Sequence, residues 1–204
     1  LRLRHHGEQR FIALGTEYGE PDLLPPSLDG AKCVVIGSDG TARFDDFPAS
    51  PLDSSRVDEV RRIAADGSAE VEGKLIFSRF LSAKLRSQLT RLSADKRAPV
   101  YEGVVQKIVP GIKLNAAAMT GFDGLDERLA LNYSGELGGA TPIGRGLQLP
   151  QPAAESGLSA LADPKSRTLP LWLDPSDEVE EIRVTLIPPA GSTLEAPAPL
   201  KLEV

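Results

Sequence analysis

The chain has 204 residues, of which 41% are hydrophobic and 25% are charged, and its formal net charge is −6. These values indicate a globular protein and disfavour an intrinsically disordered one. Lysines and arginines are scattered, whereas nucleic-acid-binding proteins usually carry a basic stripe, so we expect no nucleic-acid partner. No apolar run approaches the ~20 residues of a membrane-spanning helix. Cys33 is the only cysteine, which excludes an internal disulfide.

The N-terminal part predicts short strands separated by turns. The apolar run Phe11–Leu14 is typical of one strand, and the segment that follows it is too rich in Pro and Gly for regular structure. Ala31–Ile36 and Thr41–Phe44 flank Asp39-Gly40, a dipeptide that favours a hairpin because Gly accepts a positive φ. We therefore expect a hairpin here.

The segment from residue 55 to residue 111 predicts a second hairpin and a helical pair. Ser55–Ala65 and Ala69–Phe77 flank Asp66-Gly67, and the Arg and Glu content of the first strand indicates that one of its faces is wet. A helix follows behind a potential N-cap at Ser78, with apolar positions at helical spacing: Leu81, Leu85, Leu89 and Leu92. A second helix is predicted to begin near Pro99 and to end at Pro110-Gly111, with an apolar face: Tyr101, Val104, Val105 and Ile108.

The remaining chain predicts further strands and a linker. The expected strands are Ile112–Met119, Arg128–Leu137, Gly146–Leu149, Thr168–Leu173, Glu180–Ile187 and Leu200–Val204. Pro150–Ser166 is small, polar and punctuated by proline, which is typical of a linker. Because strands outnumber helices and tight turns join most of them, we predict a mainly β fold (all-β/α+β). Its expected form is an antiparallel β-sandwich with an inserted pair of amphipathic helices, followed by a small β domain.

These patterns divide the chain into four expected parts. Residues 1–50 form a lead-in segment with one or two hairpins, and residues 51–150 form the sandwich with its helical pair at 78–110. Residues 151–166 are the linker, and residues 167–204 are the terminal β domain, which could pack on the sandwich.

Candidate nucleophiles and metal ligands are few. Cys33 lies in an apolar strand, where a free cysteine behaves as a small hydrophobe. His5 and His6 are the only imidazoles and lie at the chain start. One cysteine and two histidines do not supply the four ligands of a structural zinc site. We therefore assign no catalytic, cofactor-binding or metal-binding residue.

Acidic and glycine-rich loops have simpler explanations than chemistry. Asp174-Pro175-Ser176-Asp177 is typical of a turn, and the neighbouring Trp172 of a core residue, although a lone Trp can also stack on a sugar. Two groups of carboxylates lack the spacing of a calcium loop and are interpreted as solvated: Asp123, Asp126 and Glu127 in one, Asp174, Asp177 and Glu178 in the other. Gly135–Ala140 lies between strands and does not open a helix, unlike a phosphate loop.

Several of these segments resemble one protein family. They are Tyr18-Gly19, then Leu24-Pro25-Pro26-Ser27-Leu28-Asp29-Gly30 before the strand AKCVVI, then Ala65-Asp66-Gly67-Ser68, Pro110-Gly111-Ile112-Lys113-Leu114, Arg167–Leu171 and Glu181–Pro188. Together they resemble the region after the catalytic core in bacterial transglutaminase-like proteins, whose papain-like core is flanked by β-sandwich domains of unknown function. The resemblance implies a periplasmic, secreted or cell-envelope location. It also implies one partner, the papain-like core of the same parent chain.

The resemblance implies that this chain is not itself catalytic. The family's core uses a Cys-His-Asp triad, with the acid in a leucine-aspartate-proline-threonine passage. The matching positions are Ala13-Leu14-Gly15-Thr16, where Leu14 takes the place of the acid and Gly15 that of the proline. The Cys and His would lie upstream. The chain starts without an initiator Met or a signal peptide, so we interpret it as part of a longer product.

Three functions follow as hypotheses. The first is a non-catalytic accessory region of a transglutaminase-like protein, with a structural or partner-presenting role. The second is a carbohydrate- or peptide-binding β-sandwich module, although aromatic residues make up only 5% of the chain. The third is an enzyme, either the tail of an active Cys-His-Asp enzyme whose core lies upstream or one that uses an unrecognised carboxylate site. The first requires the fewest assumptions.

Overall fold

The computed structural model of the chain describes residues 2–5, 8–11, 18, 20, 23–25, 28, 30–37, 39–47, 53–124, 127–139, 141–143, 146–148 and 179–192. Before the helical pair, the strands are β1 (Arg2–His5), β2 (Glu8–Phe11), β3 (Lys32–Ile36), β4 (Ala42–Asp46), β5 (Ser54–Ile63) and β6 (Ala69–Ile76). The helices are α1 (Arg79–Leu89) and α2 (Ala94–Ile108). The later strands are β7 (Ile112–Thr120), β8 (Ala130–Leu137), β9 (Thr141–Ile143), β10 (Gly146–Gln148) and β11 (Val179–Ile187).

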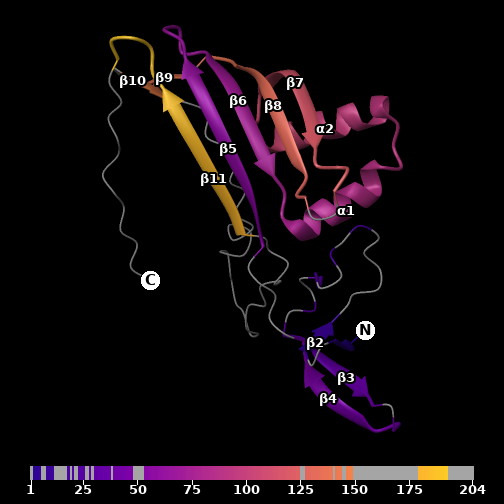
Figure 1. Ribbon diagram of the computed structural model, residues 1–204. Coiled ribbons are helices and arrows are strands. Elements are labelled where there is room, and N and C mark those ends of the chain that lie inside the picture. The colour runs from indigo at the N-terminus through magenta and orange to yellow at the C-terminus, as the bar shows by residue number, and fades with distance from the viewer. Residues whose placement is uncertain are drawn as a thin grey trace, which may run out of the picture.

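A five-stranded sheet in the order β11-β5-β6-β8-β7 forms the body of the described structure (Figure 1). β5, β6, β8 and β7 pair antiparallel, whereas β11 pairs parallel with β5. The smaller pairs β1-β2, β3-β4 and β9-β10 are two-stranded and antiparallel. The predicted β-rich α+β fold with an inserted helical pair is therefore confirmed.

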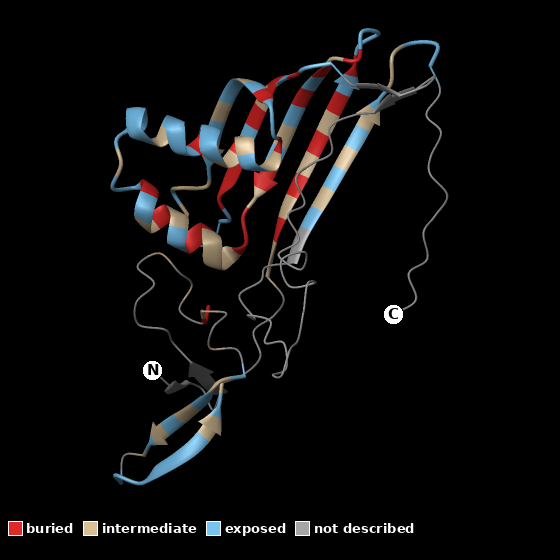
Figure 2. Cartoon of the chain, turned by 180° about the vertical axis from the view of Figure 1, so that it is seen from behind, coloured by how far each residue is buried: buried red, intermediate tan, exposed pale blue. Residues whose placement is uncertain are grey.

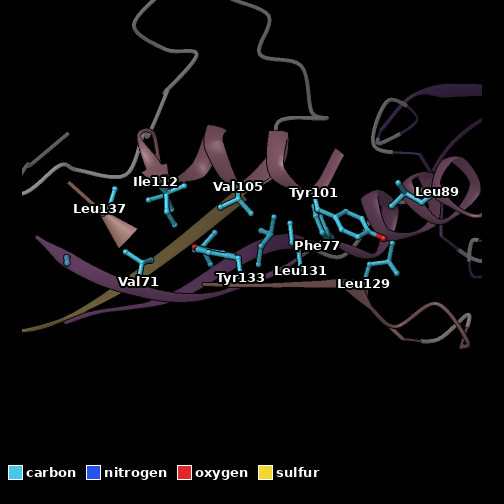
Figure 3. Packing of buried hydrophobic residues seen from close by; sticks show 14 of the residues in the cluster. Val71, Phe77, Leu89, Tyr101, Val105, Ile112, Leu129, Leu131, Tyr133 and Leu137 are labelled. Carbon is cyan, nitrogen blue, oxygen red and sulfur yellow. The ribbon is translucent and has the colours of Figure 1, made fainter. Parts of the chain in front are cut away.

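The helical pair is the layer that packs on this sheet. The chain leaves β6, forms α1 and α2, and returns as β7 on the far side of β8, so that both helices lie over one face (Figure 3). The opposite face carries ion pairs such as Arg62–Glu72 at 2.9 Å and Arg183–Glu181 at 2.9 Å. Because these charges need solvent, that face is unsuited to a second packed sheet. Where the sequence predicted a sandwich, the described second layer is helical.

The two predicted Asp-Gly hairpins have turns of the same kind. Asp66 Oδ1 accepts hydrogen bonds from the Ser68 backbone N–H at 3.0 Å and the Ser68 hydroxyl at 2.7 Å, and Gly67 has a φ of 83°. These bonds lower the pKa of Asp66 because they favour the charged carboxylate. The turn between β3 and β4 repeats the pattern with Asp39 and Thr41. Both turns are confirmed.

The first helix begins as predicted, but the second begins earlier. Ser78 caps α1 by accepting the Leu81 N–H at 3.2 Å. The prediction that the second helix begins near Pro99 was wrong, because α2 begins at Ala94 and contains Pro99. Arg97 explains the difference, since its Nε donates to the Leu89 carbonyl at 2.8 Å and the Leu92 carbonyl at 2.9 Å. These bonds join the start of α2 to the last residue of α1 and to the connection between the two helices.

The core lies between the sheet and the helices (Figure 3). Buried side chains alternate along β5, β6 and β8, as expected for strands with one covered face (Figure 2). The predicted face of the second helix is confirmed, with Tyr101 and Val105 buried and Val104 and Ile108 packed against them. Of the four leucines predicted for the first helix, only Leu89 is fully buried, and Leu92 lies after the end of α1. Ser82 and Arg86 are the buried polar residues of that helix.

The ends of the chain are described in part. Of the predicted strand Phe11–Leu14, Phe11 ends β2 and the rest lies outside the described residues. The predicted strand at Gly146 is β10, and its partner β9 was not predicted. Pro150–Ser166, Thr168–Leu173 and Leu200–Val204 lie outside the described residues. The strand predicted at Glu180–Ile187 is β11, which joins the five-stranded sheet beside β5.

Gly73 lies where the Tyr133 ring passes over β6. Glu59, Gly73 and Tyr133 lie in one row across β5, β6 and β8. A Cβ atom at position 73 would overlap the ring of Tyr133, so the ring occupies the space that a side chain on β6 would fill. Glycine at this position therefore allows Tyr133 to cross β6 and reach β5.

We predict that Gly73→Ala destabilises the protein, because the added methyl collides with the ring and displaces its hydroxyl from Glu59. The expected loss in the free energy of unfolding is about 3 kcal/mol, measured by urea denaturation. Gly103→Ala is the matched control, because a Cβ at that exposed helical position meets no atom within 4 Å. It should raise stability by roughly 0.5–1 kcal/mol, since alanine favours helix. Equal effects of the two substitutions would contradict this account.

Candidate functional site

The residues singled out as candidate nucleophile and bases are not brought together in the described structure. Cys33 lies on β3, is half-buried and has Asp45 of β4 as its cross-strand neighbour. His5 ends β1, but its side chain is not described, and His6 lies outside the described residues. Within the described ranges, no three His, Cys, Asp or Glu side chains come together as a possible metal site. The expectation of a non-catalytic chain stays a prediction.

Some of the acidic, aromatic and glycine residues singled out in loops are described by the structure, and others lie outside it. Asp123 and Glu127 are exposed, as expected for solvated acids, and Asp126 lies outside the described residues. Trp172, Asp174, Asp177 and Glu178 also lie outside the described residues. Gly135 is buried inside β8, where a Cβ would meet the Lys113 carbonyl oxygen at 2.6 Å. Its role in the described structure is close approach between β7 and β8.

A buried polar network was missed by sequence reasoning. The side chains of Glu59 and Arg61 are 1% and 3% exposed and form an ion pair on the helix-facing side of β5. The Tyr133 hydroxyl donates to the other carboxylate oxygen of Glu59 at 2.7 Å. The charges of this strand therefore lie on both of its faces, whereas the sequence analysis assigned them to one wet face. The sequence did contain a signal for this pair. Glu59 and Arg61 have opposite charges, lie two residues apart, and so fall on the strand face that also carries Val57 and Ile63.

The network raises the pKa of Tyr133. Burial is the larger cause, and the hydrogen bond to the Glu59 carboxylate adds to it, because both favour the neutral phenol. A neutral hydroxyl that donates to a carboxylate is suited to holding that carboxylate in place. It is unsuited to accepting a proton near neutral pH. The network therefore fits a structural role better than acid–base catalysis.

A second buried cation joins α1 to distant segments. Arg86 is 1% exposed, and its guanidinium donates to the Gly121 carbonyl at 2.7 Å and the Glu127 carbonyl at 2.6 Å. A longer bond of 3.5 Å reaches the Tyr18 carbonyl. Ser82, one turn earlier, accepts the Leu129 N–H at 3.0 Å. These bonds fix α1 against the β7–β8 connection and against the lead-in segment.

An apolar groove lies between the end of α2 and the start of β5 and β11. Its volume is about 650 Å³, within the range of small-molecule pockets. Lys107 and Glu181 are its charged residues. Its apolar lining consists of Val57, Leu75, Phe77, Val104, Ile108, Pro110 and Ile182.

The β3–β4 hairpin carries the most exposed apolar surface of the described residues. Val34, Ile36 and Phe44 are 57%, 73% and 82% exposed. The register places Val34 opposite Phe44, and Ile36 opposite Ala42, so these side chains share one face of the hairpin. An ion pair between Lys32 and Asp46 at 3.0 Å lies at one end of this face. Figure 2 shows the hairpin apart from the five-stranded sheet, with its strands coloured exposed or intermediate.

The buried ion pair can be tested by a mutant cycle. Arg61→Met leaves the Glu59 carboxylate buried without its cation and should lower the free energy of unfolding by about 3–5 kcal/mol. Adding Glu59→Gln removes the orphaned charge but keeps an acceptor for Tyr133, so the double variant should recover at least ~1 kcal/mol. Arg62→Met on the exposed face is the control, because its pair with Glu72 is 47% and 64% exposed. It should cost under ~1 kcal/mol. Additive losses in the cycle would refute the coupling.

The raised pKa of Tyr133 predicts an alkaline effect on stability. Unfolded tyrosine ionises near pH ~10, whereas folded Tyr133 stays neutral to higher pH. The contribution is therefore complete below pH ~10 and is lost as pH rises from there toward the folded pKa, with a slope up to ~1.4 kcal/mol per pH unit. Tyr133→Phe should remove this slope, which urea unfolding between pH ~9 and ~11 measures. Parallel curves for the two proteins would show that Tyr133 ionises alike in both states.

Comparisons with known proteins give no relative. No family model matches the chain, and no curated protein or solved structure matches it. No helix in the described part of the chain is long and apolar enough to cross a membrane. The candidate binding surfaces of the described residues are the groove and the exposed face of the β3–β4 hairpin.

Proposed function

We propose that the chain is a non-catalytic accessory region of a bacterial transglutaminase-like protein, and that it docks onto the papain-like core of the same protein. The observation that carries the proposal is the exposed apolar face of the β3–β4 hairpin, formed by Val34, Ile36 and Phe44. The resemblance in turn and strand patterns supports the choice of family. The partner is the one that this family implies.

An uncovered hairpin of this kind needs a partner for physical reasons. A two-stranded hairpin is marginally stable in water unless its apolar face packs on another element. Contiguous apolar surface on a soluble protein is a common mark of an interaction site. The β3–β4 hairpin makes no extensive contact with another described element. Burial of Phe44 against a partner would satisfy both the hairpin and the exposed face.

The groove between α2 and β5 favours the peptide-binding alternative. It offers apolar walls with a lysine and a glutamate, a combination that can seat an apolar peptide with polar ends. The hairpin takes precedence, because it exposes large apolar side chains that a docked domain would cover. Under the alternative, peptide binding would depend on Val104 and Ile108 and would be unaffected by changes in the hairpin.

The proposal predicts that the hairpin is protected only in the longer protein. Amide hydrogen exchange of residues 32–46 should slow when the papain-like core is present, relative to the 204-residue chain alone. Phe44→Ser should abolish the protection because it removes the most exposed apolar side chain of the face. Arg43→Ser is the matched control, since Arg43 neighbours Phe44 and points to the other face.

Two results would contradict the proposed function. One is equal exchange of residues 32–46 with and without the core, which would mean that the face stays uncovered. The other is equal protection in the Phe44→Ser and Arg43→Ser proteins, which would mean that the apolar face does not make the contact.

A further inference from the structure

A small cavity lies where α1 meets the lead-in segment and the β7–β8 connection. Its volume is about 10 Å³, close to the space that a single water-sized particle needs. Arg79 and Arg86 line it from α1, Arg128 lines it from just before β8, and Glu20 lines it from the lead-in segment. The cavity is therefore too small for an organic ligand, but it can hold one small ion or one water molecule.

Arg86 brings a buried charge to this cavity. The residue is 1% exposed, and among the described residues its guanidinium bonds to backbone carbonyls and to no carboxylate. The Nε atom of Arg86 is buried and has no hydrogen-bond partner in the described part of the chain. Buried charges are normally paired, and buried donors are normally hydrogen-bonded. Arg86 therefore needs one counter-charge and one acceptor.

The other two arginines at the cavity have carboxylate partners. Arg79 lies 3.0 Å from Glu20, and Arg128 lies 3.1 Å from Asp53. Each of these ion pairs is neutral as a whole. The charge that remains at the cavity wall is therefore the single positive charge of Arg86.

A small monovalent anion meets both needs of Arg86. It supplies one negative charge, and it accepts hydrogen bonds from guanidinium groups, which donate and never accept. A water molecule would accept the Nε hydrogen bond but would leave the buried charge uncompensated. Glu127 also lines the cavity, but it is an exposed residue, and its carbonyl, not its carboxylate, bonds Arg86.

We propose that this cavity binds one chloride-sized anion, held by the charge and the Nε of Arg86. The bound anion links the lead-in segment, through Glu20 and Tyr18, to α1 and to the start of β8. The folded state is therefore stabilised by chloride. This site does not depend on the proposed docking function, which uses the exposed face of the β3–β4 hairpin.

Unfolding of the full 204-residue chain by urea, in sodium chloride and in sodium gluconate at equal ionic strength, tests the site. Gluconate is too large for the cavity, and equal ionic strength keeps the screening of surface charges alike. A ligand that binds only the folded state lowers the equilibrium constant for unfolding. A Kd of about 10 mM would lower it by about tenfold at ~100 mM chloride. The chloride nuclear magnetic resonance line should also broaden more with the folded protein than with the unfolded one.

Two substitutions at the cavity should change the chloride dependence in opposite directions. Glu20→Gln removes a negative charge beside the anion and should tighten chloride binding, whereas Arg79→Gln removes a positive charge and should weaken it, each by roughly fivefold. Both side chains are partly exposed, so we expect both variants to fold. Arg62→Gln is the matched control, because the Arg62–Glu72 pair is on the exposed face of the sheet, and it should leave the chloride dependence unchanged.

Three results would overturn the proposal. The first, which needs no variant, is equal stability in chloride and gluconate, which would leave the cavity to a water molecule. The second is a chloride dependence that neither Glu20→Gln nor Arg79→Gln alters. The third is a chloride dependence that Arg62→Gln alters as much as they do, which would place the effect outside the cavity.

Discussion

The Tyr133 ring crosses the full width of β6 so that its hydroxyl can donate to Glu59 on β5. Three requirements meet in this contact. Gly73 must lack a side chain, Glu59 must present an acceptor oxygen to the hydroxyl, and Arg61 must pair with the same carboxylate. Because removal of one partner leaves another buried and unsatisfied, the three strands are held in one register. A shift of β6 by one residue would place Glu72 or Lys74 under the ring.

Beyond this contact, two arginines hold the helical layer in place by donating hydrogen bonds to backbone carbonyls. Arg86 binds the carbonyls of Gly121 and Glu127, and Arg97 binds those at the end of α1. The Arg97 guanidinium also lies 5.2 Å from the centre of the Phe122 ring, just after β7. Carbonyl acceptors depend on backbone position, so these bonds form only when the helices and the β7–β8 connection are in place. The exposed apolar face of the β3–β4 hairpin takes no part in these bonds.

Local signals predicted the parts of the fold that depend on neighbours in sequence. Asp66-Gly67 and Asp39-Gly40 specify their hairpins because the aspartate bonds the residue two positions later. Ser78 specifies the start of α1 for the same kind of reason. Signals failed where a distant residue decides. The bonds of Arg97 outweigh the tendency of Pro99 to begin a helix. The parallel pairing of β11 with β5 joins segments that are far apart in the sequence, and no pattern within either segment predicts it. The buried pair Glu59–Arg61 was hidden because charged residues usually indicate a solvated face.

The candidate surfaces were predicted less well than the fold. The run Cys33–Ile36 is apolar at consecutive positions, which does not indicate that Val34 and Ile36 share an exposed face with Phe44.

Nuclear magnetic resonance of the Tyr133 hydroxyl tests the central contact most directly. A buried donor to Glu59 predicts a slowly exchanging hydroxyl proton and nuclear Overhauser contacts between the ring and Gly73. A hydroxyl that exchanges as fast as in a free tyrosine, with no contact to Gly73, would contradict the account.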